Sequence, residues 1–448
     1  MNKNKTIAGV SLVLALGAPQ AIAAVSAEEA ARLGQDLTLM GAERSGNADG
    51  TIPEWTNKPL ASTDVDALLQ EKPLFTITAE NVEQYKDRLS AGQLVMFNTY
   101  PDSYKMNVYP THRTAVYPKA IYEKGVANAT TAKLVEGGNG ISDFNGITPF
   151  PIPQNGLEVV WNHITRYRGG MLEREVVQLP VARNGAFNPI SVYETFLMPY
   201  QVEGYELKKD DDNIIFYYTQ KIQSPPRLTG NVLLVHETLD QVRQPRQAWK
   251  YNAGQRRVRR APQVAYDSPG SATDGQRTTD QLDMFNGAPD RYEWKLVGKQ
   301  ELYIPYNSFK LASGEHSYKD ITRPGHLNPE LTSYELHRVW KVEATLKEGA
   351  RHVYAKRVFY IDEDSWQIAV ADLYDGRGQL WRVQEGHQMQ YLAPSVPWLA
   401  AETNHDLQSG RFLVSGLSNE RSESGYNFDF VAKRNTFTPS AIRRAGKR

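Results

Sequence analysis

The part of the chain after Gly170 reads as a long series of short strands, and this feature constrains the fold more than any other. Runs rich in Val, Ile, Tyr, Phe and Trp alternate with Pro, Gly, Asn and Asp turns at fairly regular intervals. The predicted strands are residues 172–182, 190–200, 213–223, 230–239, 246–252, 256–261, 292–305, 333–346, 352–362, 365–374, 379–391 and 411–417. Because no helical period separates them, they predict one large antiparallel sheet and not βαβ units.

Residue parity within these strands predicts that the sheet has one broad apolar face. In 333–346, Leu336, Trp340 and Val342 share a face, whereas most of the intervening positions are charged or polar. The side chains expected on the concave side of the sheet are Trp249, Tyr251, Leu336, Trp340, Val342, Trp366, Ile368 and Val370. They line either an ordinary packed core or a cavity that holds a ligand.

Arg338 is the charged residue among these candidate ligand-binding positions. It has the parity of Leu336 and Trp340, so regular strand pairing would turn its guanidinium toward the apolar face. A charge placed there is costly unless it is paired. Three alternatives remain: an internal ion pair with an acidic side chain, a bulge that turns Arg338 to solvent, or a bond to the carboxylate or phosphate head group of a ligand.

One helix is expected to pack against the sheet, and the rest of the chain to wrap around it. Residues 155–167 place Leu157, Trp161 and Ile164 at helical spacing behind Asn155, a favourable helix cap. This helix opens the segment 155–395, which also contains most of the predicted strands. Residues 24–154 are interrupted by Pro and Gly and predict a wrap of loops and short helices. Residues 396–448 predict a C-terminal strand or arm with a basic tail.

Several polar segments are expected at the surface. Residues 268–290 are polar and contain Gly, which predicts an excursion with a short helix at 279–285. The last eleven residues carry four basic side chains and predict a mobile end. Acidic groups at 210–212 and at Glu363 and Asp364 fall in predicted turns, which favours solvated loop tips.

The first 23 residues have the pattern of a secretory signal peptide. Lys3 and Lys5 precede an apolar run at 7–17, and residues 21–23 supply the small residues of a cleavage site. The run is too short for a permanent membrane span, so we expect a mature chain beginning at Ala24 or one residue later. Cleavage would leave 49 basic against 51 acidic residues, a net charge of −2. The sequence therefore predicts export to the periplasm.

Composition and motifs exclude most familiar chemistry. The chain has no cysteine, which rules out disulfides, thiolate nucleophiles and Cys-type metal sites. Its balanced charge provides no footprint for nucleic acid. There is no G-x-S-x-G motif, no P-loop and no H-E-x-x-H pair among the nine histidines. No catalytic residue, cofactor or metal site is predicted.

The loop at residues 45–56 partly matches a calcium-binding loop. Asn47 and Asp49 stand at its third and fifth positions, and Gly50 at its sixth. The twelfth position, which should carry a bidentate carboxylate, is Thr56. The same residues are also typical of an Asx-type turn, so cation binding stays an open alternative here.

Phrases spread over nearly the whole mature chain resemble a known family. They lie at residues 41–55, 109–113, 148–155, 249–251, 257–262, 338–340, 360–366 and 374–381, and include YIDEDSW and YDGRGQLW. They are similar to an uncharacterised secreted family of proteobacteria, known as a domain of unknown function. That family is grouped with the outer-membrane lipoprotein-sorting (LolA/LolB-like) superfamily.

The resemblance implies a mainly β fold, with a large antiparallel half-open barrel, covering helices and long N-terminal loops. It further implies a hydrophobic cavity that holds acyl chains in the periplasm. Relatives occur beside resistance-nodulation-division type exporters and outer-membrane β-barrel proteins, which implies partners in a transport pathway.

Together these observations predict a periplasmic carrier of a lipid or another hydrophobic molecule. A sheet with an aromatic face and no catalytic constellation suits a container better than an enzyme. Two alternatives stay open: a hydrolase of unfamiliar type, and a structural adaptor between an exporter and an outer-membrane protein.

Overall fold

The computed structural model describes residues 25–209, 211–241, 243–262, 264, 266–421 and 425–447. The expected signal peptide therefore lies outside the described residues. No helix within the described ranges is both long and apolar enough to cross a membrane.

One curved sheet of 16 strands dominates the fold. Across the sheet the strands follow the order β1 (Phe75–Ile77), β2 (Met106–Val108), β14 (Tyr334–Leu346), β15 (Lys356–Asp362), β16 (Ile368–Tyr374), β17 (Leu380–Tyr391), β18 (Val396–Asp406), β19 (Arg411–Leu417), β5 (Met171–Val181), β6 (Ile190–Leu197), β7 (Ile214–Ile222), β8 (Val232–Thr238), β9 (Gln247–Asn252) and β10 (Arg257–Arg260). In addition, β11 (Tyr292–Pro305) pairs with β14, and β20 (Tyr426–Asn427) pairs with β5.

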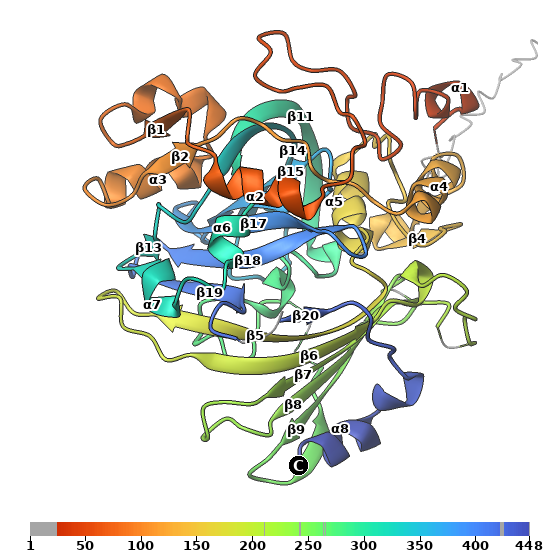
Figure 1. Ribbon diagram of the computed structural model, residues 1–448. Coiled ribbons are helices and arrows are strands. Elements are labelled where there is room, and N and C mark those ends of the chain that lie inside the picture. Colours follow the sequence, from red (N-terminus) through yellow and green to blue (C-terminus); the bar gives the residue numbers. More distant parts are fainter. Residues whose placement is uncertain are drawn as a thin grey trace, which may run out of the picture.

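The sheet is antiparallel throughout except where β2 meets β14. In the described part of the chain β10 pairs only with β9, so the sheet curves without closing (Figure 1). The mainly β, half-open antiparallel fold predicted from the sequence is therefore confirmed. All twelve predicted strands are present within a few residues of their expected bounds. The sequence did not predict the short strands β1, β2 and β20, or the long strand β18. Strand β18 is buried on both faces and so shows no polar alternation.

Helices and short turns cover the sheet. The helices are α1 (Ala27–Ala30), α2 (Ser62–Gln70), α3 (Ala91–Thr99), α4 (Lys119–Asn128), α5 (Gly156–Thr165), α6 (Phe309–Ala312), α7 (Tyr318–Ile321) and α8 (Pro439–Ala445). Two small sheets, which the sequence did not predict, pair β3 (Lys133–Val135) with β4 (Gly140–Ser142) and β12 (Thr322–Arg323) with β13 (His326–Leu327). The 3₁₀ turns are η1 (Val82–Gln84), η2 (Lys86–Arg88), η3 (Glu136–Gly138), η4 (Pro199–Gln201), η5 (Thr279–Gln281), η6 (Pro289–Arg291) and η7 (Arg434–Thr436). In Figure 1 the helices α1 to α4 lie at the β11–β15 end of the sheet, and α8 lies at the opposite end beside β9.

Helix α5 forms where its sequence predicted it. The Asn155 side chain caps the helix by accepting a hydrogen bond from the Glu158 amide at 3.1 Å. Gly156 lets the first turn approach the sheet, because a Cβ atom there would lie 3.1 Å from the backbone nitrogen of Leu296 and from Val342 Cγ1. The helix is thereby held against β11 and β14.

The largest apolar cluster lies on the concave side of the sheet. We call it the concave cluster; it joins β6 to β9 with β14 to β16 and β18, and it includes α5. Strands so far apart in the sheet can share a cluster only where the sheet curves around it. Trp161, in α5, is fully buried at its centre and donates a hydrogen bond to the Gly138 carbonyl at 2.9 Å.

The opposite side of the sheet is also covered, by three smaller clusters. An outer cluster packs α3, β1 and β2 against β11 and β14 to β17, and includes Phe97 and Leu302. A second packs α6 and α7 against β5 and β19. The third, the α8 cluster, packs Phe437 and Ile442 against β7 to β9. Both faces of the sheet are therefore apolar, and parity alone does not say which face is concave.

The C-terminal tail is ordered, so the prediction of a mobile end is wrong for its described residues. Thr438 caps α8 with its hydroxyl, and Pro439 occupies the first turn. Ile442 is 1% exposed and anchors the helix in the α8 cluster. The composition predicted the basic charge of the tail correctly. It did not predict the ordered helix, which depends on the single buried residue Ile442.

Candidate functional site

The concave face is covered by a segment that the sequence placed at the surface. Residues 266–288, which we call the covering segment, contain one short regular element, η5, and lie in the chain between β10 and β11. Met284 and Phe285 are buried in the concave cluster, and the Phe285 ring lies 5.5 Å from the rings of Phe359 and Trp294. The prediction of a polar excursion over 268–290 is therefore wrong, although a short helical turn does occur within 279–285.

Ion pairs and hydrogen bonds attach the covering segment to its surroundings. Asp283 accepts hydrogen bonds from Arg166 at 2.5 Å, from Arg168 at 2.8 Å and from the indole of Trp398 at 3.0 Å. Further contacts include those that join Asp280 to Arg357 and His352, Arg277 to Glu402, Gln281 to Asn404, and Asn286 to Glu237. The segment is thus bound through side chains of β8, β15 and β18 and of the residues after α5.

The two aspartates that hold the segment are ionised over the ordinary pH range. Burial alone would raise the pKa of Asp280, but Arg357 and His352 outweigh it, and the pKa lies below its usual value. Asp283 is likewise lowered, because Arg166 and Arg168 outweigh its burial. His163, which contacts the carbonyls of Trp366 and Asp283, has its pKa lowered to about 3 by burial and by Arg166. This histidine is therefore neutral and holds α5, β16 and the covering segment together.

The backbone of the covering segment is strained at its point of attachment. Asp283 and Met284 have φ angles of 57° and 69°, in the left-handed region that side chains disfavour. Such conformations cost on the order of 1–3 kcal/mol each and persist only where the surroundings impose them. The ion pairs of Asp283 supply that constraint.

The concave side holds little free space with the segment in place. A cavity of about 40 Å³ lies between the segment and strands β7 and β8, lined by Tyr218, Val235 and Leu282 among others. A hollow of about 210 Å³ lies beside β7 to β9, where Leu233 of β8 and Ser271 of the segment are among its lining residues. Two larger hollows lie away from the segment. One of about 490 Å³ lies beside α2, and one of about 770 Å³ lies beside α8. A ligand of lipid size therefore fits on the concave face only if the segment moves.

The structure separates the predicted site residues into three groups. Trp340, Val342, Trp366 and Ile368 belong to the concave cluster or pack against it. Leu336 and Val370 belong to the outer cluster, and Trp249 and Tyr251 belong to the α8 cluster. The expectation that all eight share the concave face is therefore wrong, and four of them do.

The reasons for this separation are local. The register between β15 and β16 shifts at Ala369, so Ile368 pairs with Ile361 while Val370 pairs with Tyr360, on the opposite face. Leu336 lies toward the end of β14 that meets β2, where N-terminal residues pack around the strand. Trp249 and Tyr251 do share a face, but α8 covers it.

Arg338 takes the first of its three alternatives, an internal ion pair. Its guanidinium donates to the Ser45 carbonyl at 3.0 Å and to Glu363 at 3.3 Å, and it lies 3.5 Å from Glu43. A ligand head group would have to displace these partners.

Glu363 and Asp364 lie at the centre of a buried ionic cluster and not at a solvated loop tip. Glu363 contacts Lys299 at 2.7 Å, and Arg113 donates to both oxygens of Asp364, at 2.7 and 2.9 Å. Asp211, in the other acidic turn, is also buried, with Tyr217 and Arg434 as partners. The acidic character of these turns predicted that they are exposed to solvent. The side chains of Glu363, Asp364 and Asp211 are buried because arginines distant in the sequence pair with their carboxylates.

Three residues in this cluster could be considered as metal ligands. One ligand atom from each of His337, Asp362 and Asp364 lies within 4.8 Å of the others. However, Arg113 occupies both oxygens of Asp364, and Glu335 accepts at 3.2 Å from His337, whose pKa is raised because Glu335 and Asp362 outweigh its burial. A protonated imidazole fits this donor set better than a metal ion.

The loop at 45–56 forms an Asx-type turn. The Asn47 side-chain oxygen accepts from the Ile52 amide at 2.8 Å, and an Asp49 oxygen accepts from the Thr51 amide at 3.1 Å. Arg88 binds the other oxygen of Asp49. The oxygens that calcium would need are thus already engaged by the loop and by Arg88.

These features define a mainly β protein with a half-open antiparallel sheet and a covered apolar concave face. A family model described as "Protein of unknown function (DUF1329)" matches residues 76–443. An uncharacterised protein of Pseudomonas aeruginosa is 56% identical over 447 residues, which span 98% of this chain and 97% of the relative. The chain therefore belongs to the DUF1329 family, and the resemblance seen in its sequence is confirmed.

The solved structures to which this chain shows partial similarity include two crystal structures. A DUF1329 family protein from Desulfovibrio piger is 17% identical, with a TM-score of 0.42, over 61% of this chain and 91% of that protein. A LolA superfamily protein from Nitrosomonas europaea is 12% identical, with a TM-score of 0.38, over 64% of this chain and 98% of that protein.

Proposed function

We propose that this protein is a periplasmic carrier that binds a lipid or another hydrophobic molecule on the concave face of its sheet. The observation that carries the proposal is the nature of the cover over that face. An apolar surface spanning both halves of the sheet is closed by residues 266–288, a strained segment attached largely by polar contacts.

Polar attachment makes such a cover separable. Arginines and carboxylates released from an ion pair regain hydration in water, which offsets much of the lost attraction. The apolar side chains uncovered at the same time gain nothing from water, and they favour a hydrophobic ligand in place of Met284 and Phe285. Opening of the segment and ligand binding are therefore coupled in this proposal.

Four of the sequence-predicted residues are the proposed ligand contacts: Trp340, Val342, Trp366 and Ile368. Trp340 is half-buried, and its ring stacks near that of Trp366 at 6.3 Å. Phe359 and Trp398, which the sequence did not single out, would join them once the segment withdraws.

The cellular context of the proposal comes from the sequence. Residues 1–23 have the signal-peptide pattern, and the absence of cysteine suits an oxidising compartment. A transport pathway with a resistance-nodulation-division type exporter and an outer-membrane β-barrel protein is supported by the family resemblance alone.

Lipid retention by two matched variants tests the proposal. The purified protein is incubated with membrane extract, and bound lipid is identified by native mass spectrometry. Trp340→Glu places a carboxylate on the concave face and should strongly lower retention. Trp249→Glu makes the same change at another half-buried tryptophan, under α8, and should retain lipid like the parent.

Three outcomes would contradict the carrier. The parent protein could retain no lipid, both folded variants could lose it equally, or the lipid could be released as a cleaved product. The last result would establish a hydrolase instead.

A further inference from the structure

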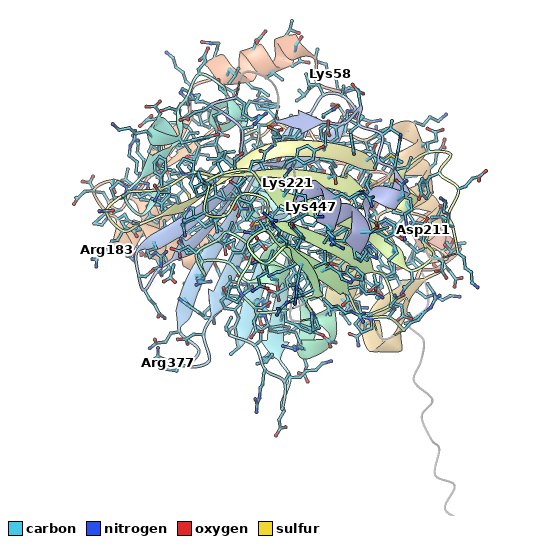
Figure 2. The ribbon with its side chains drawn as sticks, turned by 90° about the horizontal axis from the view of Figure 1, so that it is seen from below. Lys58, Arg183, Asp211, Lys221, Arg377 and Lys447 are labelled. Carbon is cyan, nitrogen blue, oxygen red and sulfur yellow. The ribbon has the colours of Figure 1, made fainter. Side chains whose placement is uncertain are left out.

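A groove with a strongly basic lining lies between β10 and α8, at the open end of the sheet. It has a volume of about 770 Å³ and is lined by Arg256, Arg257, Val258, Pro439, Ser440, Arg443, Arg444 and Lys447. All five cationic side chains are exposed, and none forms an ion pair with an acidic residue in the described part of the chain. Figure 2 views the molecule from below and labels Lys447 near the middle of the view.

The groove concentrates charge in a chain that is neutral as a whole. Its 51 basic and 51 acidic residues balance, yet no acidic residue lines this groove. Like charges in one groove repel one another, and at physiological ionic strength salt screens this repulsion largely at separations beyond about 8 Å. An anionic partner removes that repulsion.

The fold holds these charges in a fixed arrangement. Ile442 and Phe437 anchor α8 in the α8 cluster. The end of the helix lies so close to β9 that a Cβ atom on Gly446 would fall 2.2 Å from the Tyr251 ring. Arg443 and Arg444 are therefore carried by a helix that is packed against the sheet, and Lys447 follows its end, where its amide donates to the Arg444 carbonyl at 3.3 Å.

Protection of the sheet edge explains only part of this pattern. Basic side chains on an edge strand discourage pairing with another strand, and β10 is such an edge. This accounts for the arginines at β10, but not for the three cations of α8 and the residues that follow it.

We propose that the β10–α8 groove docks the protein on a membrane surface rich in anionic phospholipid head groups. The groove is open, and none of its lining side chains is buried, so it lacks the enclosed donors that hold a single anion. Exposed cations spread over a helix and a strand match the distributed charge of a bilayer surface. This docking role is independent of whether the concave face carries a ligand.

Sedimentation with vesicles tests the docking surface. The purified protein should bind vesicles of phosphatidylcholine mixed with phosphatidylglycerol, bind pure phosphatidylcholine weakly, and lose binding as salt is raised. Each basic residue near an anionic surface contributes about fivefold in affinity. The double variant Arg443→Glu with Arg444→Glu should therefore lose at least about tenfold.

The matched control reverses two exposed arginines elsewhere, Arg183→Glu with Arg377→Glu, which lie at the margin of Figure 2. This control has the same net charge as the test variant and should bind almost as well as the parent. Equal loss in both variants, or equal binding to both kinds of vesicle, would overturn the proposal. Binding of poly-glutamate without binding of vesicles would overturn the lipid assignment in favour of an acidic protein partner.

Discussion

The two faces of the sheet are covered in different ways. On the outer side, α3 packs mainly through apolar side chains such as Met96 and Phe97, and its N-terminal end also donates hydrogen bonds to two buried carboxyl groups of the sheet. On the concave side, the covering segment contributes Met284 and Phe285 but is fastened by the ion pairs of Asp280 and Asp283. Under the proposed function, this difference predicts that the outer cover is permanent, whereas the concave cover can be exchanged for a ligand.

The two covers differ in energy because apolar and ionic groups are hydrated differently once a cover separates from the sheet. Apolar packing is lost entirely when the surfaces part. A buried ion pair that separates into water loses its attraction but recovers hydration, so the pair as a whole adds little to stability. Removing one partner alone is different, because a buried charge remains without compensation.

The largest expected effect concerns the outer cover. Phe97→Ala should lower the free energy of unfolding by about 4 kcal/mol, the cost of emptying a fully buried aromatic site. Chemical denaturation measures it, with Leu74→Ala, at a side chain 65% exposed, as the control. Similar small effects in both variants would show that α3 does not hold the outer face.

A somewhat smaller effect is expected at the concave cover. Asp283→Asn leaves Arg166 and Arg168 buried without a counter-charge, which should cost about 3 kcal/mol. Because the segment also loosens, the variant should bind a hydrophobic dye more strongly than the parent, and Phe97→Ala should not do so while it remains folded. Asp66→Asn, an exposed aspartate, is the control. Loss of stability without a gain in dye binding would contradict the exchangeable cover.

The smallest of the three effects is a pH dependence that differs between the faces. Under α3, burial raises the pKa of Glu385 to about 7 although Gln93 and Tyr334 donate hydrogen bonds to it. The folded state then binds a proton that the unfolded state has released, so its stabilising contribution is present below the unfolded pKa and is lost as pH rises toward 7. Stability should fall by about 2 kcal/mol from about pH 5 to pH 7 through this group.

Glu385→Gln should reduce that slope, measured by denaturation at several pH values; Asp372, whose pKa burial raises to about 6, contributes a remaining slope of the same sign. The aspartates of the covering segment act in the opposite sense. Their pKa values are lowered, so their contribution is present above the unfolded pKa and is lost only as pH falls through the lower folded value. A variant that keeps the parent's slope between about pH 5 and pH 7 would show that Glu385 is not its source.

Much of the architecture could be read from local patterns. The twelve predicted strands, the cap at Asn155 and the turn at 45–56 depend on neighbours in the sequence, and all are present. Parity failed at Val370 because a single bulge reverses a face, and it failed at Trp249 because both faces are apolar. Neither the bulge in β16 nor the cover that α8 provides changes the alternation of residues along the sequence, so neither could be predicted from it.

The candidate site was only partly predictable. Trp340 and Trp366 were found by alternation, but Asp280 and Asp283 lay in a segment whose composition suggested exposure. The sequence did contain a signal for these buried partners, namely arginines that stand beside apolar residues. Arg357 precedes the apolar run 358–361 of a predicted strand, and Arg166 and Arg168 follow directly on a helix with a broad apolar face. Arginines in such places are buried at a high cost unless they are paired.

The sequence by itself determined the strands, the helix α5, the family and the export pattern, because each is encoded in the spacing of nearby residues. Only the tertiary structure decided which face is concave, what covers it, and where the charges go. Those features depend on pairs such as Asp283 with Arg166, which are more than a hundred residues apart. Such pairs are stable only after the sheet has curved around them and excluded water.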